Sequence, residues 1–158
     1  MPMGKTQFTV RALFVAAVLG CVLGGFGCAQ QSSMTDSGTP PPPSAAVTFC
    51  DNPAPGCAAG TSFSVSVLRD LSIRVQWSNL SPGNHVQTLN FILPDGNVYE
   101  SMETSFAIAE EPVGATTTLQ ALPVAGTFIT ERSLTGQWRI EVSLDGEPMG
   151  SRAVRLDP

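Results

Sequence analysis

Residues 136–156 read GQWRIEVSLDGEPMGSRAVRL and contain the clearest structural signal in the chain. In the first half of this stretch every second residue is apolar, at Trp138, Ile140, Val142 and Leu144. A period of two places one face of a strand in a core and the other face in water. Asp145-Gly146 follows at once, and Asp-Gly is a dipeptide that tight hairpins prefer. The stretch therefore predicts the two strands of an antiparallel β-hairpin.

The same alternation recurs earlier in the chain. Turn sequences at Ser81–Asn84 and Pro94–Asn97 separate neighbouring runs. About seven or eight strands are expected from this spacing. They would span 62–68, 72–78, 86–93, 97–106, 115–122, 127–131, 137–144 and 151–157. This pattern predicts an all-β fold, an antiparallel β-sandwich, with a small closed barrel as the alternative.

The order and size of these strands resemble an immunoglobulin or fibronectin type III-like domain. The resemblance covers residues 47–158 and rests on the alternation, on Trp77 in an early strand and on the terminal hairpin, which is similar to the last strands of many bacterial extracellular modules. The Cys–Trp–Cys arrangement of antibody domains is not present, because no Cys follows Cys57. The resemblance implies binding through exposed edge strands or end loops. The end loops include 79–86, 94–97 and 145–150.

The charge distribution excludes one class of partner. The chain has 158 residues, of which 42% are hydrophobic and 13% charged, and its formal net charge is −5. Beyond residue 28 there are six Arg, no Lys and all 13 acidic residues, so that part carries a charge of −7. Phosphate binding needs a basic patch, which so acidic a chain does not offer. We therefore expect no binding to nucleic acid.

Residues 1–28 have the organisation of an export signal. Lys5 and Arg11 precede an uncharged apolar run at 12–27, ALFVAAVLGCVLGGFG, and small residues follow at Gly27-Cys28-Ala29. The alternative is an uncleaved membrane anchor. A spanning helix needs about 20 apolar residues, and this run is shorter and contains helix-weakening glycines. We therefore predict a cleaved signal peptide over 1–28.

A Cys after a small residue at the end of such a run resembles the lipobox of bacterial lipoproteins, which implies that its thiol receives a diacylglycerol. Cys28 follows Gly27 and precedes a polar stretch, so it is the preferred lipidation site. Cys21 fits the motif but precedes more apolar residues, and is the second choice. Cleavage after Ala29 by ordinary signal peptidase is the third. Lipidation would hold the protein at a membrane of the bacterial cell envelope, whereas the third choice would leave it secreted.

A flexible linker is predicted at residues 29–46. The stretch is rich in Gln, Ser, Thr, Gly and Pro and includes Pro40–Pro43, which favours an extended polyproline II conformation. Such a segment cannot bury a core. We expect it to space the domain, residues 47–158, from the membrane.

Cys50 and Cys57 are the other two cysteines of the chain. In an exported protein, two cysteines around a short segment predict a local disulfide. Closing such a loop contributes about 2–3 kcal/mol in the chain-entropy model. Redox-active pairs usually have the tighter Cys-x-x-Cys spacing, and zinc needs four ligands. The pair therefore predicts a structural disulfide and no metal site.

No group of residues has the spacing of a catalytic site. His85 is the only histidine, and we expect it to be solvent-exposed at the start of a strand rather than to act as a general base or pH sensor. Ser81 is close in sequence, but neighbours across a turn do not make a triad. Pro94–Asn97 supplies only a fragment of a calcium loop. Nothing selects a glycosidase pair among the carboxylates of this half of the chain. These are Asp95, Glu100, Glu103, Glu110 and Glu111. We therefore predict no catalytic, cofactor-binding or metal-binding residue.

The function predicted from the sequence is that of a membrane-tethered envelope lipoprotein. Its β-sandwich would act as a non-catalytic module that binds or supports a protein partner, without a cofactor. A carbohydrate- or ligand-binding module is the first alternative, and exposed aromatic side chains would favour it. Trp77 and Trp138 are expected in the core, because they are in phase with apolar neighbours. A hydrolytic enzyme is the second alternative.

Overall fold

The computed structural model describes residues 39–54, 57, 59–109 and 111–158. The predicted signal peptide at 1–28, with its candidate sites Cys21 and Cys28, and most of the predicted linker at 29–46, including Ala29, lie outside these residues. The strands and the helix span β1 Ser44–Cys50, β2 Ser62–Ser64, β3 Asp70–Leu80, β4 Gly83–Ile92, β5 Val98–Ile108, β6 Gly114–Pro123, α1 Phe128–Glu131, β7 Gly136–Leu144 and β8 Glu147–Asp157. In the described part of the chain, no helix has the length and apolar character needed to cross a membrane.

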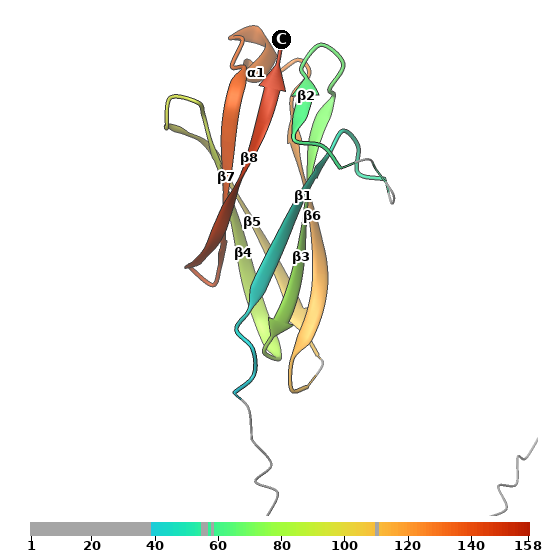
Figure 1. Ribbon diagram of the computed structural model, residues 1–158, viewed down its shortest axis with the longest axis vertical. Coiled ribbons are helices and arrows are strands. Elements are labelled where there is room, and N and C mark those ends of the chain that lie inside the picture. The colour runs from blue at the N-terminus through green and yellow to red at the C-terminus, as the bar shows by residue number, and fades with distance from the viewer. Residues whose placement is uncertain (1–38, 55–56, 58, 110) are drawn as a thin grey trace, which may run out of the picture. The chain divides into compact units, whose positions relative to one another are not determined.

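The strands form two sheets that pack face to face (Figure 1). One sheet has the order β1-β3-β6, and the other has the order β2-β8-β7-β4-β5. In an immunoglobulin-like sandwich the first, second and fifth strands share one sheet, and the third, sixth and seventh share the other. The two sheets reproduce this division, with β5 as the additional strand beside β4 and β2 as a short strand beside β8. The predicted all-β, immunoglobulin-like sandwich is confirmed, and its strand pairs in the described residues are antiparallel except for the short β2, which runs parallel to β8.

The structure differs from the predicted strands in three places. The first strand begins at Ser44, inside the predicted linker, because the small residue Ala45 pairs with Trp77 and faces the core. The strand predicted at 62–68 ends at Ser64, where the chain turns and leaves Val67 exposed. The strand predicted at 127–131 is wrong, because these residues form the short helix α1 and its cap.

Helix α1 replaces a strand for a local reason. The hydroxyl of Thr127 accepts a hydrogen bond from the amide of Ile129 at 3.3 Å, which caps the first turn. Ile129 is completely buried, so a single apolar side chain attaches this turn to the core. Of residues 127–131, Ile129 alone is buried, and a single buried position in the sequence is compatible with either a capped turn or a strand.

The core contains the side chains that the alternation predicts. Trp77 and Trp138 are both buried, as expected from their phase. The Trp138 indole donates a hydrogen bond to the carbonyl of Leu134 at 3.0 Å. The largest fully buried side chains come from both sheets and from α1. They are Trp77, Trp138, Phe49, Phe91, Leu71, Ile73, Leu80, Leu89, Leu122, Ile129, Ile140 and Leu156.

Gln87 introduces a polar connection into this apolar core. Its side chain comes from β4 and is fully buried, and its Oε1 accepts a hydrogen bond from the Trp77 indole of β3 at 2.8 Å. The same oxygen accepts a second bond from the Thr118 hydroxyl of β6 at 2.5 Å. One buried acceptor thus joins the two sheets. The two bonds to this oxygen matter because a buried donor left unmet costs more than a formed bond contributes. The Nε2 atom of Gln87 is itself buried and has no partner among the described residues.

We expect Gln87→Leu to lower the free energy of unfolding by about 1–3 kcal/mol, because it leaves the Trp77 indole buried without an acceptor and leaves Thr118 only its long contact of 3.5 Å with the carbonyl of Val75. Urea denaturation measures this change. Gln137→Leu is the matched control, since Gln137 is exposed on β7 and the change there should stay within about 0.5 kcal/mol. Equal effects at the two positions would show that the buried acceptor has no special role.

Candidate functional site

His85 is the first residue to examine, because it is the only histidine. Its ring lies at the start of β4 and is 8% exposed, packed against Phe106 with a distance of 5.7 Å between ring centroids. Nδ1 is 2.7 Å from Oδ2 of Asp145, and Nε2 is 2.8 Å from the carbonyl oxygen of Ser81. The prediction of a solvent-exposed His85 is therefore wrong, because Asp145 reaches it from the turn between β7 and β8.

Both ring nitrogens of His85 face groups that only accept hydrogen bonds. The Ser81 carbonyl and the Asp145 carboxylate therefore both favour the doubly protonated ring and raise the pKa of His85. The same pairing, together with the bond from the Val86 amide, lowers the pKa of Asp145. Ser81 contributes its backbone carbonyl to this contact. The three residues thus hold two turns together and leave no ring nitrogen free to act as a base.

The carboxylates named from the sequence do not form a metal site in the described residues. Asp95 accepts bonds from the amide and the side chain of Asn97, both at 2.9 Å, and these bonds lower the pKa of Asp95. The hydrogen bonds to the Asp95 carboxylate therefore come from within the same turn. Glu100 and Glu103 are exposed on β5, and Glu110 lies outside the described residues. No three His, Cys, Asp or Glu side chains within that part of the chain could hold a metal ion together.

The predicted disulfide is present between Cys50 and Cys57. It joins the end of β1 to the segment that leads to β2. Nearby, the amide of Gly60 donates a hydrogen bond to the carbonyl of Phe49 at 3.0 Å. These two links keep the β1–β2 connection against the end of β1, and they determine where the chain changes from one sheet to the other.

This change of sheet leaves an open seam, defined here as the gap between β1 and the part of β8 before Val154. β2 pairs with β8 only at residues 155–157. The remainder of β8 pairs with β7 on one side and has no strand partner on the other among the described residues. β1 pairs with β3 but not with β8. Two strand edges from different sheets thus face each other across the seam.

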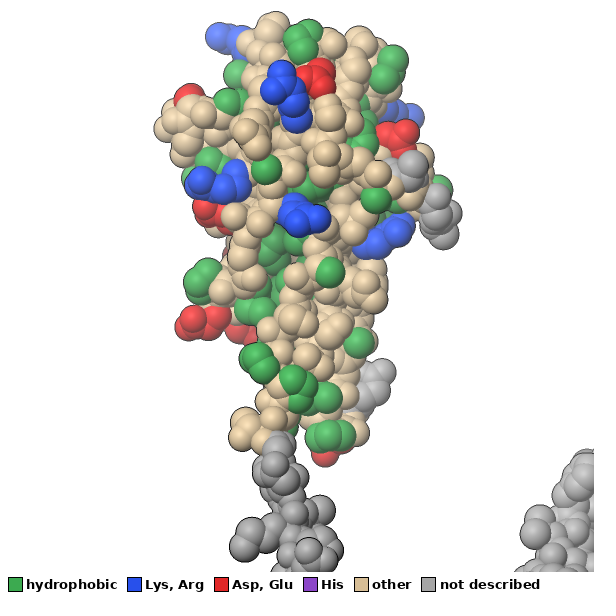
Figure 2. Space-filling model, viewed as in Figure 1, with side chains coloured by type: hydrophobic (Ala, Val, Ile, Leu, Met, Phe, Trp, Pro, Cys, Tyr) green, Lys and Arg blue, Asp and Glu red, His purple; other side chains and the backbone are tan. Residues whose placement is uncertain are grey.

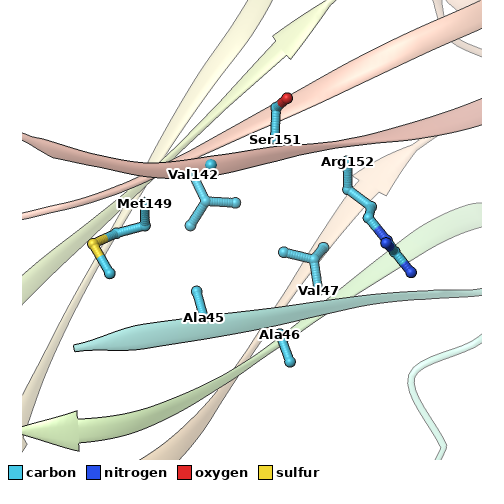
Figure 3. A pocket seen from close by; sticks show the side chains of 8 residues that line it. Ala45, Ala46, Val47, Val142, Met149, Ser151 and Arg152 are labelled. Carbon is cyan, nitrogen blue, oxygen red and sulfur yellow. The ribbon is translucent and has the colours of Figure 1, made fainter. Parts of the chain in front are cut away.

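The seam contains a cleft of about 350 Å³ whose exposed surface is more polar than apolar, although several of its lining residues are small or apolar (Figure 3). Ala45 and Val47 line it from β1, and Val142 and Met149 line it from the other sheet. Figure 3 shows the Arg152 side chain extending from β8 toward β1, beside Val47. A second hollow continues past Phe49 and Gly60 and shares Val47 and Arg152 with the first.

Arg152 has an unusual position in the seam. It pairs with Ile140, so it belongs to the core-facing series of β8 that continues with Val154 and Leu156. It is nevertheless exposed, because no strand covers it. Arg139 and Arg155 form salt bridges with Glu141 and Asp157, whereas Arg152 forms none within the described part of the chain.

The opposite side of the sandwich carries a direct side-chain link between the sheets. There the Gln120 side chain of β6 donates a hydrogen bond to the hydroxyl of Thr104 on β5, which joins the two sheets. No side-chain hydrogen bond of this kind joins β1 to β8 in the described residues. On the face that Figure 2 shows, exposed apolar side chains lie among arginines. The seam is the candidate binding site, and sequence reasoning missed it. The sequence does contain a signal for the seam. Gly150 and Arg152 occupy positions of β8 that, by alternation with the buried Val154 and Leu156, should hold apolar side chains.

Comparisons with known proteins find only distant likenesses among solved structures. No family model matches the sequence, and no curated protein matches it. Among solved structures, an immunoglobulin-like protein from Pseudomonas aeruginosa is 15% identical, covers 75% of this chain and 99% of that chain, and has a TM-score of 0.47. A CARDB domain from Pyrococcus furiosus, solved in complex with di-metal ions, is 12% identical, covers 73% and 88%, and has a TM-score of 0.42. A β-glucosidase from Listeria innocua is 11% identical, covers 73% of this chain but 16% of that one, and has a TM-score of 0.45. The fold assignment rests on the strand order described above.

The His85–Asp145 contact predicts a pH-dependent contribution to stability. The folded-state pKa of His85 is raised above its ordinary value of 6.5, so the contribution is fully present below that pH and is lost as pH rises through the raised value. We expect the difference in unfolding free energy between the unmodified protein and His85→Gln to be larger at about pH 5.5 than at about pH 9. Urea denaturation at the two pH values measures it. A difference that grows toward alkaline pH would contradict the assignment.

Proposed function

We propose that this protein is a lipid-anchored module of the bacterial cell envelope that binds a protein partner at the seam and catalyses no reaction. The observation that carries the proposal is the unpaired edge of β8 beside a cleft that Val47, Met149 and Arg152 line, within the described residues. Exposed strand edges pair readily with other chains, and edge pairing is a common mode of peptide recognition. Main-chain bonds supply affinity in this mode, and side-chain pockets supply specificity.

Two features favour a binding role over the alternatives. Both nitrogens of His85 are engaged with Asp145 and Ser81, so the one histidine is committed to holding turns together. Trp77 and Trp138, the two tryptophans, are buried and present no stacking platform for a sugar. A protein ligand fits the available surface better, because a strand edge offers hydrogen-bonding groups of the backbone.

The proposed tether consists of Cys28 and the Pro-rich segment that follows it. β1 begins at Ser44, which pairs with Ser78 near the end of β3, so the described chain enters the sandwich at the end where β3 turns into β4 (Figure 1). An N-terminal cysteine that carries several acyl chains would hold the domain stably at the membrane, since a single acyl chain gives only weak, reversible attachment. A disulfide between Cys50 and Cys57 fits an oxidising compartment outside the cytoplasm.

We expect Cys28→Ser to move the protein from the membrane fraction to the soluble fraction, because the acylated thiol is lost. Fractionation followed by mass measurement of the mature N-terminus tests this. Cys21→Ser is the matched control and should leave both the membrane attachment and the acylated mass unchanged. Membrane attachment that persists in Cys28→Ser and disappears in Cys21→Ser would assign the anchor to Cys21.

The partner is tested with a photo-reactive amino acid placed at Ser151, on the free edge of β8. We expect light to produce one discrete cross-linked species in intact cells, because Ser151 lies on the free edge of β8 beside the cleft, where an added strand would pair. The same group at Ser105 is the control, since Ser105 is exposed on β5, the edge strand of the same sheet remote from the seam. Equal cross-linking from the two positions, or none from Ser151, would contradict the proposed binding site.

A further inference from the structure

We infer that the occupant of the seam is an extended strand of the partner that carries a carboxylate opposite Arg152 and a bulky apolar side chain opposite Gly150. This inference rests on the proposed function and names the chemistry of its ligand. Three features of the seam support it: the free backbone groups of β8, the space above Gly150 and the charge of Arg152.

The backbone groups come first. The amide of Arg155 donates to the carbonyl of Thr61 at 2.8 Å, and the carbonyl of Asp157 accepts from the amide of Val65 at 2.8 Å. These groups point away from β7. Because the lateral direction of backbone groups alternates along a strand, those of Ser151 and Ala153 point to the same side. There β8 has no strand partner in the described chain. An added strand would pair with the same edge of β8 that β2 pairs with at residues 155–157.

Gly150 creates room for a large side chain. It pairs with Val142, a buried core residue, so a side chain at position 150 would face the cleft. Nothing lies within 4 Å of the position that a Cβ on Gly150 would take. A strand added beside β8 would place one side chain over this gap, between Ala45 and Met149. These walls are apolar or small, so a branched aliphatic side chain fits the gap best.

Arg152 determines which charge is favourable on the added strand at the side chain that follows the apolar one on the same face. Side chains two residues apart on the added strand share a face, so the one after the apolar residue would lie beside Arg152. Covering an arginine without a partner is costly, because the charge loses water and gains no compensating group. Arg152 has no salt bridge within the described chain, so a carboxylate on the incoming strand would supply its partner.

A second copy of this chain satisfies this requirement less well. The core-facing residues of its β8 are Gly150, Arg152, Val154 and Leu156, and none is acidic. Its strand would bring a second arginine to the cleft rather than a carboxylate. Pro148 lacks an amide donor, and the bulge between Val142 and Ser143 interrupts the strand pair at that end. These features disfavour self-pairing and favour a different protein.

The test uses blocked nine-residue peptides of alternating Thr and Val, with a central Asp and an Ile two positions to each side of it. Two further peptides carry Asn or Lys in place of Asp. Fluorescence anisotropy with the full chain in mild detergent measures binding. We expect the Asp peptide to bind about five-fold more tightly than the Asn peptide, and the Lys peptide to bind most weakly. Hydrogen exchange should show protection of the Ser151 and Ala153 amides.

Arg152→Glu should reverse this preference, so that the Lys peptide binds best. Arg132→Glu is the control, because Arg132 is exposed beside α1 and its substitution should leave the order unchanged. Thermal unfolding verifies that both variants fold, and each should melt within a few degrees of the unmodified protein because both side chains are exposed.

Three outcomes would overturn the inference. They are equal binding of the Asp and Lys peptides, an order unchanged in Arg152→Glu, and protection of β5 amides instead of β8 amides. If Ser151 still cross-links a partner in cells, the proposed function stands and only this ligand chemistry fails. If the peptides follow the expected order but Ser151 captures nothing, the ligand chemistry stands and the envelope partner fails.

Discussion

Gln87 determines how the two sheets lie on each other. Its side-chain oxygen accepts bonds from Trp77 and Thr118, which belong to different strands of the opposite sheet. Apolar contacts alone tolerate small shifts of one sheet over the other, whereas a buried acceptor with two donors resists them, because a shift would break both bonds to the Gln87 oxygen. The arrangement of the remaining strands therefore follows from where β3, β4 and β6 meet.

The two sides of the sandwich differ because of what is added to this centre. On the β5–β6 side, Gln120 and Thr104 supply a further bond between the sheets. On the β1–β8 side, the disulfide and the Phe49–Gly60 bond instead direct the chain away from the sheet edge before β2 joins β8. The connection crosses from one sheet to the other near the end of β1, and the part of β8 before Val154 is left without a neighbour in the described chain.

The sequence predicted the sandwich because a period of two is a local property of each strand. It did not predict β1, since Ala45 and Val47 are too small to stand out beside a Pro-rich linker, and it mistook the capped turn after Thr127 for a strand. The sequence pattern also did not predict the environment of His85, because its partner Asp145 lies 60 residues away in the chain. The seam depends on which strands pair laterally, and alternation within one strand contains no information about that.

An exposed strand edge is usually a hazard, and the features that limit this hazard also determine what the seam can bind. The bulge, Pro148 and the inward-facing Arg152 make indiscriminate pairing unfavourable. Arg152 does so conditionally, because its charge opposes any strand that covers it without offering a carboxylate, and stabilises one that does. A strand without a carboxylate is rejected because it would bury the charge of Arg152 unpaired, and this selection requires neither a large interface nor a catalytic group. In the proposed mode of binding, a single charged residue among the inward-facing positions of β8 protects the edge and selects its ligand at the same time.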